Sequence, residues 1–299
     1  MDEEVMRWSF SAHGTFIRCH RMYFFRYIMS SHNAKDPVRR ECFLLSQLQH
    51  TSDWMGSLAH NAIASDFVPS AESGKPLTED MIRNHIISLA KKQYEFSVAK
   101  LYRTTTKKDA SEAYCALYVH DYGIGLEKST LMKEVDEFAS TVAQNLVSQK
   151  DMIALISKSS WIRPEVNLAW KIKPDATVFG QLDVLSFSDD RKATIIDWKT
   201  GSFGSGSRNQ MAVYGRLVLE KWTNLTLDDI EITEINLRHG KVITHKMNET
   251  DMLSTEDFIY QSIFDIQQVT QNHEFDSQIK RISEYSYAGS VNSCRYCSD

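Results

Sequence analysis

The chain has 299 residues, of which 42% are hydrophobic and 24% charged, so it can bury a substantial core in one large domain or two ordinary ones. Its net charge of -5 excludes a protein that coats nucleic acid over its whole surface, although one local basic groove stays compatible with it. No apolar run is long enough to cross a bilayer, and the first residues lack the pattern of a signal peptide. The composition therefore predicts a cytoplasmic globular protein with no membrane partner.

The cysteine count argues against a disulfide framework. An odd number of cysteines in a chain predicted to be cytoplasmic favours reduced thiols or metal ligands. The five are Cys19, Cys42, Cys115, Cys294 and Cys297.

The first 160 residues have helical periodicity. Residues 10–28 predict a helix, or two short ones, with Ser11 as the cap, and residues 53–67 predict a second helix capped by Asp53. Residues 78–155 are helical almost throughout and predict an inserted helical segment.

Strand patterns dominate the next 90 residues. Strands are predicted over 165–170, 178–185, 193–201, 230–238 and 241–246, with helices over 208–222 and 254–270. The expected fold is α/β, with a central mixed sheet flanked by helices and a helical insertion. We expect one composite domain with four parts: N-terminal helices in residues 1–75, the helical insertion in 76–160, the core sheet and its helix in 161–250, and a C-terminal helix with the cysteine pair in 251–299.

Two of these strands form a predicted hairpin with charged residues near its open end. Side chains alternate along a strand, so Asp197 and Lys199 share one face, and the hairpin brings Asp183 close to Asp197. Two neighbouring carboxylates repel unless a cation lies between them, which predicts a divalent-metal site with a lysine beside it. The alternative is that both acids are edge-strand residues and Lys199 is a solvated amine.

Two helices carry further candidates. Gly56 and His60 lie one turn apart, so a small residue would let this helix approach the sheet while His60 reaches the metal. Gln210 and Tyr214 also lie one turn apart, on the helix that follows the strand of Asp197. Taken singly, His60 and Tyr214 could equally be core residues, and Gln210 could be solvated.

In order, the motifs 56–60, 180–183, 197–201 and 210–214 resemble the RecB-like branch of the PD-(D/E)XK nuclease superfamily, whose members include RecB, AddB and CRISPR-associated exonucleases. The resemblance implies a restriction-endonuclease-like core and a site for Mg²⁺ or Mn²⁺. The implied metal ligands are His60, Asp183, Asp197 and the backbone carbonyl of Trp198, with Lys199 catalytic and Gln210 and Tyr214 in support. Glu165 matches a frequent acidic position of the family, whereas Val184 stands where many members have arginine.

The chain ends resemble the iron-sulfur members of the same branch. Cys19 matches the first ligand of a [4Fe-4S] cluster, and Cys294 and Cys297 match the C-terminal pair. The fourth ligand is not identified: Cys42 or Cys115 could complete the set, the chain end could be shortened, or the cluster could be lost and the cysteines ordinary thiols.

The resemblance implies a metal-dependent DNA nuclease, an exonuclease on single-stranded or unwound DNA in repair, recombination or replication. The alternative is a nuclease-like subunit that binds nucleic acid within a larger complex, with a helicase or other DNA-processing protein as partner; action on RNA stays open. Arg18, Arg21, Arg26 and Arg208 are candidate phosphate contacts, and Tyr23, Phe24 and Tyr214 candidate stacking surfaces.

Overall fold

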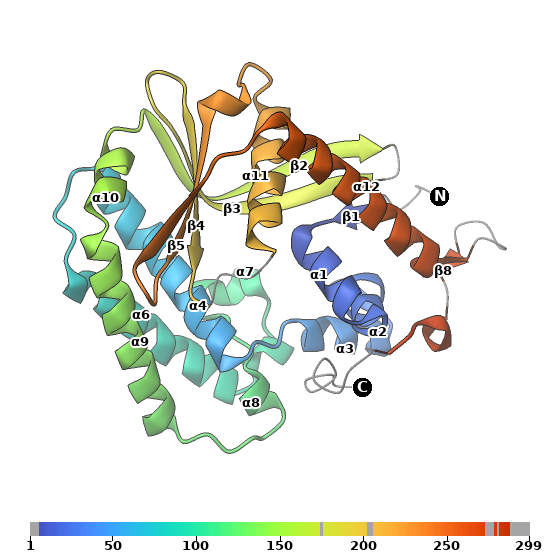
Figure 1. Cartoon of the computed structure of the whole chain (residues 1–299). Coiled ribbons are helices and arrows are strands. Elements are labelled where there is room, and N and C mark those ends of the chain that lie inside the picture. The colour runs from blue at the N-terminus through green and yellow to red at the C-terminus, as the bar shows by residue number, and fades with distance from the viewer. Residues whose placement is uncertain (1–5, 174–175, 202–205, 273–277, 280, 288–299) are drawn as a thin grey trace. The chain divides into compact units, whose positions relative to one another are not determined.

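A computed structural model describes residues 6–173, 176–201, 206–272, 278–279 and 281–287. The main sheet is mixed and has six strands flanked by helices, in the order β1-β3-β4-β5-β6, with β2 also paired to β3 (Figure 1). The strands are β1 (Met6–Trp8), β2 (Trp161–Lys173), β3 (Ala176–Phe187), β4 (Ala193–Lys199), β5 (Ile230–Asn236) and β6 (Lys241–His245). This is the α/β class that the sequence predicts.

The chain divides into two compact units. The first unit comprises residues 1–47, 168–180 and 248–299, and the second comprises residues 48–167 and 181–247. The predicted four-part division stays a prediction.

In the first unit, short helices accompany a three-residue strand. Strand β1 pairs in parallel with Ala176–Val178 of β3, and Trp8 donates its indole N–H to Ser262 Oγ at 2.8 Å. The helical elements are α1 (Phe10–Arg18), α2 (His20–Tyr23), the π-helical turn η1 (Phe24–Met29), α3 (Pro37–Ser46), α12 (Glu249–Thr270) and the 3₁₀ turn η6 (Ile282–Glu284). Two short strands, β7 (Gln271–Asn272) and β8 (Gln278–Ile279), pair with each other.

The second unit is mostly helical before its strands. Its helices are α4 (Thr51–Ala62), α5 (Val68–Glu72), α6 (Glu79–Val98), α7 (Lys107–Ala110), α8 (Tyr118–Asp121), α9 (Lys128–Ser148), α10 (Lys150–Ser157) and α11 (Ser207–Lys221). A π-helical turn, η2 (Ile63–Phe67), continues α4, and 3₁₀ turns occur at η3 (Leu101–Arg103), η4 (Ser111–Ala113) and η5 (Leu227–Asp229). The long helices α6 and α9 lie side by side (Figure 1). The predicted helical segment between the second helix and the sheet is therefore confirmed.

Local sequence accounts for several helix starts. Thr78 caps α6 by accepting from the Met81 amide, and acidic residues in its first turn favour the positive end of the helix dipole. Two predicted caps were wrong: Ser9 caps α1 in place of Ser11, and α4 starts at Thr51, so Asp53 lies in its first turn. An aspartate there still interacts favourably with the helix dipole.

Strand β4 sits between two partners of opposite direction. It is antiparallel to β3, with Val184 opposite Ile196, and parallel to β5, with Asp197 opposite Glu234. The predicted hairpin is therefore confirmed. One face of β4 carries Ile196 and Trp198 into the large core of the second unit, where Trp198 packs edge to face on Phe67 at 5.6 Å between ring centroids. Because side chains alternate, Asp197 and Lys199 point to the other face.

Across the described residues, no helix combines the length and apolar character that crossing a membrane would require.

Candidate active site

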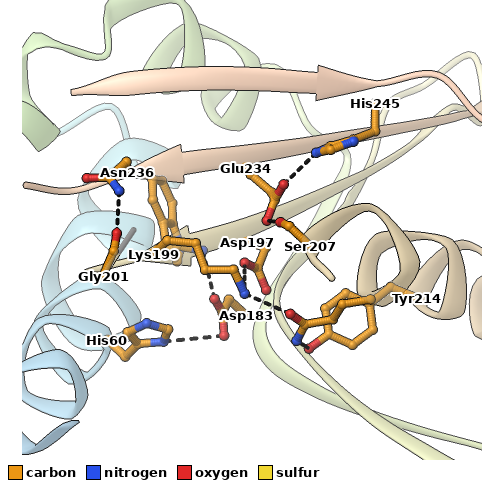
Figure 2. Close-up of polar contacts among 12 residues, drawn as sticks. His60, Asp183, Asp197, Lys199, Gly201, Ser207, Tyr214, Glu234, Asn236 and His245 are labelled. Atoms are coloured by element: carbon orange, nitrogen blue, oxygen red, sulfur yellow. Dashed lines mark hydrogen bonds and ion pairs between the residues drawn. The ribbon is translucent and has the colours of Figure 1, made fainter. Parts of the chain in front are cut away.

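Asp183, Asp197 and Lys199 converge in the second unit. Figure 2 shows their side chains pointing toward one another from β3 and β4. Asp183 accepts a hydrogen bond from the Trp198 amide at 2.8 Å, and the Lys199 amine lies 2.7 Å from Asp197 Oδ2. The structure thus brings together the three residues that the hairpin motif predicts as neighbours.

Asp197 is a buried carboxylate with two other acids, Asp183 and Glu234, near it. Its side chain is 2% exposed, and burial and then the charge of Asp183 raise its pKa to about 7, with Glu234 adding to the effect and Lys199 opposing it. The Lys199 amine, 2.7 Å from Oδ2 of Asp197, opposes this rise in the pKa but does not cancel it. One lysine therefore does not neutralise the acids around it.

The raised pKa of Asp197 should make metal-free stability depend on pH. The carboxyl group ionises near 3.8 in the unfolded chain and near 7 in the folded protein, so the folded state holds its proton more tightly. The free energy of unfolding should therefore fall as pH rises from about 4 to about 7 through this group. Asp197→Asn, which never ionises, should be more stable than wild type in EDTA at about pH 8, and its advantage should shrink toward about pH 5. Urea unfolding of both proteins measures this, and a difference that stays constant with pH would contradict it.

His60 reaches the same acids from helix α4. Its Nδ1 lies 3.3 Å from Asp183 Oδ1. Burial disfavours the charged imidazolium, but the hydrogen bond and charge of Asp183, with Asp197, outweigh burial and raise the pKa of His60. The predicted motif residue is therefore adjacent to the hairpin acids.

Gly56 lets α4 approach the end of β4. A Cβ atom at this position would lie 2.8 Å from Thr200 Oγ1, which is closer than real Cβ contacts. This confirms the prediction that a small residue here permits a close approach of helix and sheet.

Gly56→Ala should therefore destabilise the protein. The clash should cost about 1–3 kcal/mol, against a gain of at most about 1 kcal/mol in helix propensity. Thermal unfolding should show a lower midpoint for Gly56→Ala, and the added substitution Thr200→Ala should restore it. Gly14→Ala in α1 is the matched control because its Cβ would meet nothing within 4 Å. Equal midpoints for the two alanine variants would count against the close approach.

Helix α11 supplies a hydrogen-bonded relay to Lys199. The Lys199 amine donates to Gln210 Oε1 at 2.9 Å, and Gln210 Nε2 donates to the Tyr214 hydroxyl at 2.8 Å. Burial and then the charges of Asp197 and Asp183 raise the pKa of Tyr214, so its phenol stays protonated. Gln210 and Tyr214 thus lie where the sequence predicts them, and they fix the direction of the amine.

Sequence reasoning missed a second polar group on the same face of the sheet. Glu234 on β5 is fully buried; His245 Nε2 lies 2.5 Å from its Oε2, and Ser207 donates a hydrogen bond to its Oε1. Asn236, two residues on, donates to the Gly201 carbonyl at 2.5 Å. The available signal was the alternation of β5, which puts Glu234 and Asn236 on the same face of the strand as Ile230 and Ile232.

Other predicted residues lie elsewhere or outside the description. Cys19 is buried and its sulfur accepts from the Met22 amide at 3.4 Å, while Cys294 and Cys297 lie outside the described residues. Cys42 is also buried, and burial raises the pKa of the Cys115 thiol to about 12. Glu165 is exposed on β2, where its φ is 52°.

The predicted nucleic-acid contacts fare unevenly. Tyr23 and Phe24 are 5% and 6% exposed and Tyr214 is 7% exposed, so the prediction that these rings offer stacking surfaces is wrong. These rings pack inside their units because burying apolar surface is more favourable than exposing it to water. Arg18 and Arg26 are exposed, Arg21 lies 3.6 Å from the centre of the Tyr287 ring, and Arg208 donates to the Lys246 carbonyl at 3.3 Å.

The donor chemistry of this site suits a hard divalent cation. Mg²⁺ and Mn²⁺ take carboxylate and carbonyl oxygens, and the buried Asp197 Oδ2 lacks an aligned donor. Within the described ranges, however, no three His, Cys, Asp or Glu side chains already have the arrangement of a metal site. The residues therefore fit such an ion by type and charge, with Lys199 supplying the nearby positive charge.

Comparison with known proteins identifies the family. No curated protein matches the chain, whereas chains among the solved structures do. One, from Eubacterium rectale and provisionally named as an exonuclease, has 8% identity and a TM-score of 0.35, covering 80% of this chain and 86% of that one. A family model described as the PD-(D/E)XK nuclease superfamily matches residues 7–298. The match spans nearly the whole chain and includes every motif of the site, so the chain belongs to the PD-(D/E)XK nuclease superfamily.

Proposed function

We propose that the chain is a Mg²⁺- or Mn²⁺-dependent deoxyribonuclease that hydrolyses phosphodiester bonds, of the RecB-like branch of its superfamily. The observation that supports it is the convergence of Asp183, Asp197 and Lys199 in a family of nucleases. His60 lies beside Asp183, and the Gln210–Tyr214 pair lies beside Lys199. Along the chain these residues follow the order of the branch's motifs.

The metal would be held by Asp183, Asp197, His60 and the Trp198 carbonyl. A bound divalent ion would supply Lewis-acid stabilisation of the charge that develops on the scissile phosphate. The carboxylates carry the negative charge that attracts this ion, and His60 holds Asp183 in place through its Nδ1.

Lys199 is the proposed catalytic amine. Gln210 accepts one hydrogen bond from this amine, which fixes the direction of the amine. The other N–H groups of the amine stay available to a phosphate oxygen or to the attacking water. Tyr214 in turn accepts from Gln210 and keeps the amide from rotating.

The proposed substrate is single-stranded or unwound DNA, cut as an exonuclease during repair, recombination or replication. We propose a helicase or another DNA-processing protein as partner and the cytoplasm as location. A [4Fe-4S] cluster on Cys19, Cys294 and Cys297 stays a prediction; iron content and the visible spectrum of anaerobically purified protein test it.

A cleavage assay tests the function. Wild-type protein is incubated with end-labelled single-stranded DNA, blunt duplex and RNA, each with Mn²⁺, Mg²⁺ or EDTA. The proposal expects metal-dependent release of short products from single-stranded DNA and none in EDTA. Binding of DNA without cleavage in any metal would instead favour the nuclease-like subunit, and cleavage of RNA alone would reject the deoxyribonuclease.

A further inference from the structure

We propose that Glu234 is a positioning residue that acts on Lys199 through helix α11, an inference that rests on the proposed function of the same site. Glu234 anchors Ser207, the first residue of α11, and thereby places Gln210 on the Lys199 amine. No motif of the hairpin or of α11 includes Glu234 or its partner His245.

The Glu234 carboxylate is buried, and each of its two oxygens has a partner. Glu234 is 0% exposed, its Oε1 accepts from Ser207 Oγ, and its Oε2 faces His245 Nε2 at 2.5 Å (Figure 2). His245 comes from β6 and is 8% exposed, so it holds the other oxygen of the carboxylate in the interior. A carboxylate held at one oxygen can fix the group at the other with little freedom.

Ser207 is well placed to control the start of α11. Gly206 precedes it and supplies no side-chain cap, and the first turn is held by Ser207 on Glu234 and by Arg208, which donates to the Lys246 carbonyl at 3.3 Å. Gln210 lies three residues later, on the same side of the helix as Ser207. A shift of the first turn would therefore move Gln210, and with it the oxygen that accepts from Lys199.

The charge arrangement argues against a purely structural carboxylate. Glu234 pairs in register with Asp197, so a third acid stands beside two others on neighbouring strands. Like charges at this distance cost free energy, and the contacts that offset this cost are His245 on Oε2 and Ser207 on Oε1. A role in orienting Lys199 accounts for an acid at this position.

The test uses Ser207, because Glu234→Ala would leave His245 without its partner in the interior and could unfold the protein. Ser207→Ala removes the hydroxyl, Ser207→Thr keeps it, and Ser148→Ala is the matched control, a hydroxyl that bonds only within α9. Loss of one hydrogen bond should lower kcat about fivefold in Ser207→Ala with little change in KM, and Ser207→Thr should restore it.

A double-variant cycle identifies the route. If Glu234 acts through Gln210, Ser207→Ala should lower kcat in the wild-type background and leave it unchanged in Gln210→Ala. Independent effects of the two substitutions, or a loss of kcat that merely follows a loss of thermal stability, would overturn the proposal.

A second measurement needs no nuclease activity. The rate at which an amine-acylating reagent labels Lys199, read by mass spectrometry, should rise about fivefold in Ser207→Ala and in Gln210→Ala, and no further in the double variant. If wild-type protein cuts no DNA, the proposed function fails and this cycle alone decides the positioning role. Equal labelling of wild type and Ser207→Ala would refute it.

Discussion

Lys199→Ala is expected to lower the rate of DNA cleavage at least about 100-fold, the usual cost of removing a charge-stabilising donor from an active site. The Lys199 side chain is 25% exposed, and its amine donates to Gln210 at 2.9 Å and lies 2.7 Å from Asp197 Oδ2. The measurement is single-turnover cleavage of end-labelled single-stranded DNA in Mn²⁺.

Two controls make the Lys199→Ala result specific. Lys192→Ala removes an exposed lysine of the same hairpin, paired only loosely with Asp190 at 3.6 Å, and should cleave at the wild-type rate. Calorimetry should still find Mn²⁺ binding in Lys199→Ala because its carboxylates are intact. Cleavage by Lys199→Ala within twofold of wild type would remove this residue from the mechanism.

Asp183→Asn and Asp197→Asn are each expected to weaken Mn²⁺ binding at least about 100-fold, the upper range for losing even an outer partner of a metal site. Asparagine keeps the size of the side chain, and at position 183 its oxygen can still accept the hydrogen bond of the Trp198 amide. The loss should therefore report the missing charge. Titration calorimetry measures the affinity, and cleavage in the same buffer should fall in parallel.

Asp189→Asn provides the matched control for these carboxylates. Asp189 is an exposed acid in the turn of the same hairpin, so its substitution changes net charge equally without touching the site. Wild-type Mn²⁺ affinity in Asp183→Asn and Asp197→Asn would show that these acids hold no metal.

Most of the site was predictable because it follows from short-range pattern. Alternation along 193–199 places Asp197 and Lys199 together, the turn at 188–191 sets the hairpin, and helical spacing joins Gln210 to Tyr214. The close approach of α4 to the sheet was predictable from the small residue Gly56, whereas its contact with Thr200 was not.

What the sequence did not reveal depends on pairings between distant segments. Glu234 reaches the site because β5 runs parallel to β4, and nothing in the sequence between residues 197 and 234 specifies that register. Strand β1 has three residues, too few for a periodic signal. Helix α3 begins with Asp36 as its cap and Pro37 as its first residue, and an Asp-Pro pair is equally typical of a turn. The choice of Ser9 over Ser11 as a cap was equally open, since both are serines at a helix start.

Strand β4 is paired along both edges, antiparallel on one side and parallel on the other. Amide protons of this strand should then exchange with solvent only when the surrounding unit opens as a whole. The backbone that carries Asp197 and Lys199 is rigid for the same reason, so any adjustment of these two groups falls to rotation of their side chains.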